Sequence, residues 1–221
     1  MPEAWHDISA AEEPRRIEAA RRGDLDAFNW LVLQYQARVY NLCLRMLSDS
    51  DEAADATQEA FLSAYKAMPR FKGEGFRTWI LRIATNASLD ILRSRKRKPS
   101  VSLDSWASPD DGEETLDPLP IADLDPTIDP ETSALRLETM GTIQAGLESL
   151  PPDQRMVLVL VDVQGLSYDE AASITGANLG TVKSRVNRAR LRMREYLRER
   201  GVFPSVGELS GRPERSLTGE G

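Results

Sequence analysis

A stretch of residues without a single lysine or arginine divides this sequence in two, and it limits the possible folds more than any other feature. Residues 99–135 carry ten Asp and Glu side chains among prolines and serines, with no sustained hydrophobic period. Such a composition buries too little apolar surface to offset the entropy of ordering, so we expect a largely disordered linker over residues 99–132. The net charge of the chain is −7, of which −10 lies in this stretch, leaving +3 elsewhere. Two basic modules joined by an acidic strap are therefore expected.

Apolar residues on both sides of the strap recur at the spacing of a helix. Before the strap we expect helices over about residues 15–22, 24–47, 51–68 and 77–95, and after it over about 133–150, 152–163, 167–175 and 178–200. Gly23 breaks the first helix, Asp24 is a suitable N-cap for the second, and Pro69 ends the third. The predicted fold class is all-α, with two small helical domains joined by a long acidic linker and a helix-turn-helix in the C-terminal domain. The predicted domains are 14–98 and 133–200, between a disordered N-terminus (1–13) and a flexible tail (201–221).

Composition argues against several classes of function. The chain has one cysteine, Cys43, and one histidine, His6, so an intrachain disulfide and a cysteine-based metal cluster are excluded. Cys43 lies in an apolar helical stretch, where it is either a small core residue or a redox sensor. We expect no cofactor, no metal and no enzymatic activity. Apolar runs of the ~20 residues that span a membrane do not occur, and residues 1–13 do not resemble a secretory signal, so we expect a cytoplasmic protein without membrane insertion.

The C-terminal third predicts a DNA-binding element. Residues 167–175 form a short amphipathic segment in which Ser167 and Glu170 have the spacing of a capping box. A turn and a long helix capped by Asn178 follow, which is the order of a helix-turn-helix. One face of the long helix is apolar, and the other carries the candidate DNA-binding residues Thr181, Lys183, Ser184, Asn187, Arg188 and Arg192. Arginine and asparagine suit base edges and lysine suits phosphates, although a solvated basic face would give the same pattern.

A second candidate surface mixes aromatic residues with cations. A glycine loop leads into a basic helix, and the candidate residues are Gly73, Glu74, Phe76, Arg77, Trp79, Arg82, Asn86, Arg93, Arg95 and Lys96. Aromatic rings that stack on bases, interleaved with cations that neutralise phosphates, suit single-stranded nucleic acid. The alternative is that Phe76 and Trp79 are core residues and the cations are a solvated helix end.

The third feature is an acidic helix face. Asp51, Asp55 and Glu59 follow one another at intervals of four residues, with Gln58 beside them. Stacked like charges are unfavourable unless a ligand or partner uses them. The face fits docking of a partner protein better than a divalent metal site, because a metal would need ligands from a second element. A merely solvated face is the remaining alternative.

These segments, in this order, resemble the extracytoplasmic-function (ECF) sigma factors of the sigma-70 family. The motifs that carry the resemblance are DATQEAF (55–61), FRTWILRIATN (76–86), LPPDQR (150–155), GLSYDEAA (165–172) and GTVKSRVNRAR (180–190). The match covers roughly residues 24–98 and 133–197. Helix-turn-helix motifs occur in other regulators, but this combination with a linker is specific.

The resemblance implies a role for each surface. The helix of residues 51–67 would dock on the clamp helices of the largest subunit of core RNA polymerase. The loop before Phe76 and the helix after it would read and melt the −10 promoter element, and the helix of residues 178–193 would read the −35 element. The implied partners are core RNA polymerase, through its clamp helices and its flap, promoter DNA and an anti-sigma factor.

Two other classes of function remain possible on the residues alone. An ordinary transcription regulator would explain the C-terminal helices but not the aromatic and basic helix of residues 76–98. A metal-dependent nuclease would use Asp51, Asp55 and Glu59. The linker length also bears on the arrangement, because a flexible chain of that length averages about 35 Å end to end, whereas the promoter elements lie about 70 Å apart. We therefore expect the two domains to lie closer together in the free protein than on DNA.

Overall fold

The structure is a computed structural model that describes residues 12–72, 75–97 and 130–202. The expected linker, most of the N-terminal segment and of the tail, and the loop residues Gly73 and Glu74 lie outside the described residues. All regular elements of the described part are helical, which confirms the all-α class with two helical regions. In the part of the chain that the structure covers, no helix combines the length and the apolar character needed to cross a membrane.

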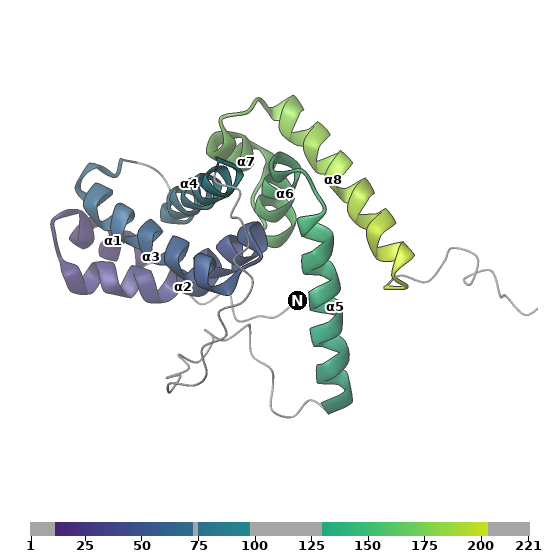
Figure 1. Ribbon diagram of the computed structural model, residues 1–221. Coiled ribbons are helices and arrows are strands. Elements are labelled where there is room, and N and C mark those ends of the chain that lie inside the picture. The colour runs from purple at the N-terminus through teal and green to yellow at the C-terminus, as the bar shows by residue number, and fades with distance from the viewer. Residues whose placement is uncertain (1–11, 73–74, 98–129, 203–221) are drawn as a thin grey trace, which may run out of the picture.

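The helices form two groups (Figure 1). The N-terminal group contains α1 (Glu13–Arg21), α2 (Leu25–Leu47), α3 (Ser50–Ala67), the 3-10 turn η2 (Met68–Arg70) and α4 (Phe76–Arg97). The C-terminal group contains α5 (Pro130–Glu148), α6 (Pro152–Leu158), the π-helical turn η3 (Val159–Val163), α7 (Tyr168–Thr175) and α8 (Leu179–Glu199). Most boundaries lie within two residues of expectation, and the start of α5 differs by three. Glu13 is already helical, and α5 begins at Pro130, because proline fits the first turn of a helix.

Side-chain caps fix the helix starts. The Asp24 carboxylate accepts a hydrogen bond from the Ala27 backbone N–H at 2.9 Å, and Asp49 caps α3 in the same way. Ser48, between α2 and α3, adopts the left-handed conformation with φ 60°. At α7, Ser167 and Glu170 form the expected capping box. These contacts span only a few residues, which is why the sequence predicts them.

The N-terminal group packs α2, α3 and α4 against one another. The fully buried side chains include Leu31, Leu42, Phe76, Ile80 and Leu81. The Cys43 thiol lies among them, and burial raises its pKa. A buried thiol with a raised pKa is a poor nucleophile, so Cys43 is a core residue in this structure.

In the C-terminal group, α7 and α8 form the expected helix-turn-helix. Gly176 ends α7 with φ +67°, a conformation that favours glycine, and the Asn178 side chain accepts a hydrogen bond from the Thr181 N–H at 2.8 Å. The apolar stripe of α8 faces inward, with Val182, Val186 and Ala189 fully buried.

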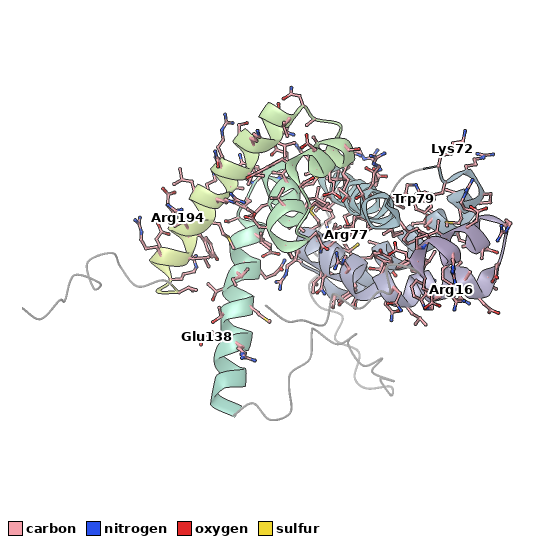
Figure 2. The ribbon with its side chains drawn as sticks, turned by 180° about the vertical axis from the view of Figure 1, so that it is seen from behind. Arg16, Lys72, Arg77, Trp79, Glu138 and Arg194 are labelled. Atoms are coloured by element: carbon pink, nitrogen blue, oxygen red, sulfur yellow. The ribbon has the colours of Figure 1, made fainter. Side chains whose placement is uncertain are left out.

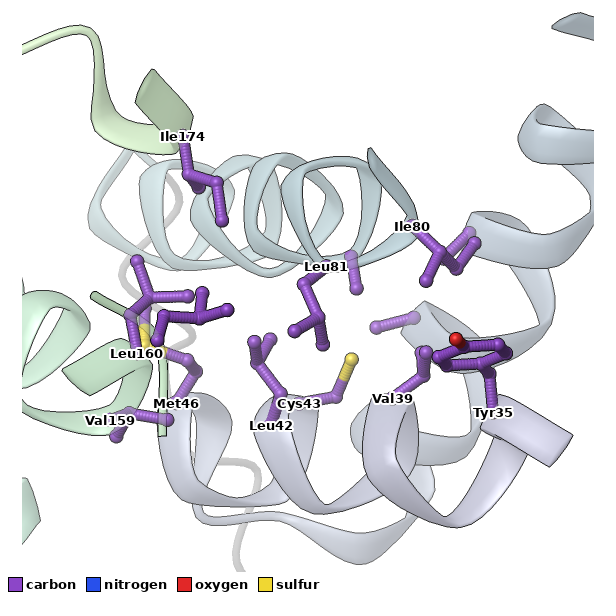
Figure 3. Close-up of a cluster of buried hydrophobic side chains, with 14 of the residues drawn as sticks. Tyr35, Val39, Leu42, Cys43, Met46, Ile80, Leu81, Val159, Leu160 and Ile174 are labelled. Atoms are coloured by element: carbon purple, nitrogen blue, oxygen red, sulfur yellow. The ribbon is translucent and has the colours of Figure 1, made fainter. Parts of the chain in front are cut away.

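The two groups share one continuous buried cluster. Figure 3 shows Leu81 and Ile80 of α4 above Leu42 and Met46 of α2, with Leu160 and Ile174 of the C-terminal group beside them. In Figure 1 the same junction lies where α4 meets α7 and where α2 meets α6. The two domains therefore pack side by side in the free chain, as the linker estimate led us to expect.

Candidate nucleic-acid interface

The exposed face of α8 carries most of the predicted −35 residues. Lys183, Asn187 and Arg188 are exposed, and their helix is held from behind by its buried valines. Ser184 is half-buried and donates a hydrogen bond to the Thr181 carbonyl at 3.0 Å. The helix thus presents a cation, an amide and a guanidinium to solvent on a rigid support, which suits contacts to base edges and phosphates.

Other arginines of α8 anchor the helix instead. Arg192, one of the predicted −35 residues, donates to the Gln154 side-chain oxygen at 3.0 Å. Arg185 pairs with Asp153 at 3.0 Å, and Arg190 donates to Asp162 at 2.9 Å. These three contacts tie α8 to α6 and η3 and fix the direction in which the exposed face points.

The aromatic residues around the glycine loop form a packed cluster. Phe76 is fully buried, and its ring centroid lies 5.5 Å from that of Trp79 and 5.2 Å from that of Tyr35. Trp79 is half-buried and also stacks against Phe71, with centroids 4.8 Å apart. Phe76 therefore offers no free ring face in this structure and supports the start of α4 from the core. Gly75, just before α4, has φ +86°, a conformation in which a side chain would be strained.

The polar side chains in the outer part of α4 differ in exposure and in the partners that they bind. Asn86 and Lys96 are exposed. Arg93 pairs with Asp90 at 2.8 Å within the helix. Arg95 donates to Glu52 of α3 at 2.9 Å and to the Leu47 carbonyl at 3.1 Å. It therefore also supplies a hydrogen-bond partner to the last carbonyl of α2. Of this part of the predicted −10 surface, Asn86 is the exposed side chain that can both donate to and accept from a base.

The first turns of α4 face the C-terminal group. Arg77 donates to the Gln164 carbonyl, and Figure 2 labels Arg77 where the two groups meet. The Thr78 hydroxyl donates to Glu170 Oε1 at 2.9 Å, and Arg82 donates to the Ser173 hydroxyl. Two predicted −10 residues, Arg77 and Arg82, are thus occupied by contacts within the chain.

Glu170 lies at the centre of this contact. Burial opposes its charged form, but hydrogen bonds from the Ser167 backbone and the Thr78 hydroxyl, with the Arg77 charge nearby, outweigh burial and lower the pKa of the carboxyl. One side chain thereby caps α7 and also bonds to α4.

The predicted docking face is exposed. Asp51, Asp55, Gln58 and Glu59 all lie on the outer side of α3. Sequence reasoning missed that this face continues with Leu62 and Tyr65, which are 46% and 42% exposed. Their spacing from Gln58, four and seven residues on, could have revealed them, because residues at these intervals share a helix face. A surface that combines carboxylates with apolar side chains suits a protein partner. Among the described residues, no group of three His, Cys, Asp or Glu side chains is arranged to hold a metal ion.

A second surface that the sequence did not indicate is an open groove of about 420 Å³ between α5, η3 and α8. Its floor is apolar, with Ile143, Leu147 and Leu197 among the lining residues, and Arg45 of α2 and Arg194 stand among the charged residues that line it. The groove depends on residues from α2, α5 and α8, so only the tertiary structure brings it together.

An exposed cationic helix-turn-helix, joined to a second helical group with a polar and basic helix, defines a DNA-binding transcription protein. Two family models match the chain, sigma-70 region 2 over residues 31–98 and sigma-70 region 4 over residues 140–193. The chain belongs to the sigma-70 family of RNA polymerase sigma factors, in its ECF group. It is accordingly a promoter-recognising initiation factor and not an enzyme.

Two curated relatives match over almost their full length. The chain is 38% identical to the ECF RNA polymerase sigma factor SigW of Bacillus subtilis over 84% of this chain and 96% of that protein. It is 36% identical to the RNA polymerase sigma-H factor of Pseudomonas aeruginosa over 83% and 92% of the two chains.

Two solved structures share the fold. CnrH in complex with the cytosolic domain of CnrY has a TM-score of 0.61 and 23% identity, covering 85% of this chain and 97% of that one. The sigma factor RpoE of Bartonella quintana, in complex with the anti-sigma factor NepR, has a TM-score of 0.58 and 24% identity, covering 79% and 98%.

Proposed function

We propose that α8 reads the −35 promoter element and that α4, with the loop before it, reads and opens the −10 element, while α3 docks the protein on core RNA polymerase. The observation that carries this assignment is the side-by-side exposure of Lys183, Asn187 and Arg188 on one face of a helix whose back is fully buried. Short polar and cationic side chains near the N-terminal half of the second helix suit the major groove.

The docking assignment is supported by the outer face of α3. Asp55 and Glu59 stand next to Leu62 and Tyr65, so a partner could pair cations with the carboxylates and bury the apolar side chains. The partner that the family implies is the pair of clamp helices of the polymerase, with the flap contacting the C-terminal group. We place this activity in the cytoplasm, where the polymerase works.

We also propose an anti-sigma factor as a partner. The sigma factor RpoE, which has this fold, is seen in complex with the anti-sigma factor NepR. The apolar groove between α5, η3 and α8 fits a helical segment of such a protein.

Transcription by core polymerase, with and without this protein, on a library of promoter fragments tests the proposal. We expect transcripts from a small set of fragments that share two sequence elements about two DNA turns apart, and none from core polymerase alone. A regulator that is not a sigma factor would leave core polymerase inactive on every fragment.

Strand opening is tested separately at Asn86, which is exposed on α4 and makes none of the core contacts of Trp79. Unstacking a base costs a few kcal/mol, and holding it returns about 1–3 kcal/mol. We expect Asn86→Ala to reduce permanganate reactivity of promoter thymines more than it reduces initial promoter binding, and a pre-melted bubble to restore transcription. Normal melting by the variant, or no rescue by the bubble, would remove Asn86 from the opening step.

A further inference from the structure

The groove between α5, η3 and α8 is an apolar surface that the described helices leave partly uncovered. Leu147, Leu158 and Leu197 line it and are buried by the neighbouring helices, whereas Val163, which also lines it, is 48% exposed. A further chain segment laid on this surface would remove apolar area from water, which is favourable. The groove therefore fits a segment with several apolar side chains.

Cations line the same groove, and they differ in whether an acid neutralises them. Arg190 donates to the Asp162 carboxylate at 2.9 Å. Arg45 donates to the side-chain oxygen of Gln144 at 2.8 Å, and among the described residues no carboxylate pairs with it. Burial lowers the pKa of the Arg45 guanidinium. A carboxylate on the occupant of the groove would offset this cost of burying a charge, and the exposed Arg194 would attract it as well.

The C-terminal end of α8 directs the chain toward this groove. Gly201 has φ +69°, and its N–H donates to the Arg198 carbonyl at 3.1 Å. The Val202 N–H donates to the Leu197 carbonyl, also at 3.1 Å. This pair of bonds is a Schellman motif, in which the residue after the left-handed one lies against the last turn of the helix. Because Leu197 lines the groove, the chain leaves α8 beside it.

The sequence continues directly after this turn with FPSVGEL (203–209). The segment has apolar residues at every third position and one carboxylate among them: Phe203, Val206, Leu209 and Glu208. The part of α8 that lines the groove, residues 190–197, is about 10 Å long at a rise of about 1.5 Å per residue. Seven residues span about 20 Å when extended, so the segment is long enough to follow the whole groove.

We propose that residues 203–209 fold back from the end of α8 and occupy the groove, with their apolar side chains on its floor and the Glu208 carboxylate toward Arg45 and Arg194. The covalent tether to α8 keeps the segment at a high effective concentration beside the groove. The helical segment of an anti-sigma factor proposed above would have to displace it. Occupancy by the segment itself needs no partner, so it is tested on the chain alone.

Photo-crosslinking in the full-length chain tests this placement. The photoreactive residue p-benzoylphenylalanine replaces Leu209, at the far end of the segment, and mass spectrometry identifies the linked peptides after irradiation. The same replacement at Leu217, in the same tail but outside the segment, is the matched control. We expect the Leu209 probe to link mainly to peptides around Val163. It should give about tenfold more product there than the Leu217 probe, the factor that burial of one apolar side chain provides.

Two substitutions, each with a matched control, report on the contacts. Val163→Glu places a charge on the apolar surface and should lower the yield of groove products about tenfold. Leu33→Glu makes the same change at an apolar residue of α2 that is 64% exposed and outside the groove, and should leave the yield unchanged. Glu208→Lys should lower the yield, because its ammonium would face the cations of the groove, whereas Glu214→Lys should not.

A mixture of unlabelled and isotope-labelled chains separates links within one chain from links between two. Links within a chain support the proposal, whereas links only between chains would make a second copy the occupant and overturn it. Equal yields from the two probes, or an unchanged yield in Val163→Glu, would overturn it as well. If the chain directs no transcription by core polymerase, the proposed function fails, and this result is unaffected.

Discussion

Arg155 joins the two helical groups, and its replacement has the largest effect that we expect from a single side chain. The residue is 8% exposed. One terminal nitrogen donates to the Met46 carbonyl at the end of α2 at 2.6 Å, and the other donates to the Glu148 carbonyl at the end of α5 at 2.7 Å. The C-terminal end of a helix carries partial negative charge, so both ends attract a cation. Burial lowers the pKa of the guanidinium, and the nearby Glu148 opposes this shift.

The substitution Arg155→Met keeps most of the side-chain volume and removes the charge and both hydrogen bonds. A hydrogen bond to a charged group contributes about 1.5–3 kcal/mol, so the two together contribute about 3–6 kcal/mol. Part of this is returned, because a buried guanidinium whose partners are carbonyls no longer has to be desolvated. We expect the free energy of unfolding to fall by about 3 kcal/mol, the size of effect that breaking a buried polar network produces.

Urea unfolding followed by circular dichroism measures this change. Arg198→Met makes the same replacement at an exposed position near the end of α8 and should change the free energy of unfolding by less than about 0.5 kcal/mol. Arg155→Lys should be intermediate, because an ammonium cannot bond in the fork geometry of a guanidinium. If Arg155→Met is as mild as the Arg198 control, the two helix ends do not depend on this side chain and the reasoning is wrong.

The remaining predictions concern the binding surfaces and the effect of low pH. Arg188→Ala should weaken specific promoter binding by about 1–3 kcal/mol and relax base preference at one position; unchanged promoter choice in a selection experiment would exclude it as a base reader. Asp55→Lys combined with Glu59→Lys should abolish co-purification with core polymerase while circular dichroism shows normal helicity. Acid should weaken the contact between α4 and α7, because Glu170 accepts a hydrogen bond from Thr78 and its pKa is lowered. That stabilisation is present above the ordinary carboxyl value of 4.5 and is lost as the pH falls through the lowered pKa, so the free energy of unfolding in urea should fall over this pH range. Glu170→Gln should remove this part of the pH dependence.

Sequence patterns predicted the helices because the signals that begin and end them are local. The Asp24 cap, the Ser167–Glu170 capping box and the Asn178 cap each involve residues three apart, and all three are confirmed. The inward stripe of α8 was read correctly for the same reason, since a helix repeats its faces every few residues. The family followed from the order of such segments, without any knowledge of how they pack.

The candidate sites were predicted less completely. The pattern around Phe76 could not distinguish a stacking ring from a core ring, and the structure buries it completely. The spacing of Leu62 and Tyr65 places them on the same helix face as Gln58, and the packing of the helices decides that they remain exposed there. Burial depends on which helices cover a face, and the sequence of one helix does not contain that information.

The sequence by itself determined the all-α class, the helix boundaries to within a few residues, and the division into two helical groups, because caps, prolines and apolar periods act over less than two turns. Only the tertiary structure decided that the two groups close on one another. The contact of Arg77 with Gln164 joins residues 87 apart, and that of Arg155 with Met46 joins residues 109 apart. No local pattern specifies such pairs. They form because the last carbonyls of α2 and the polar side chains of α4 require hydrogen-bond partners. The C-terminal group supplies donors to the end of α2 and acceptors to α4.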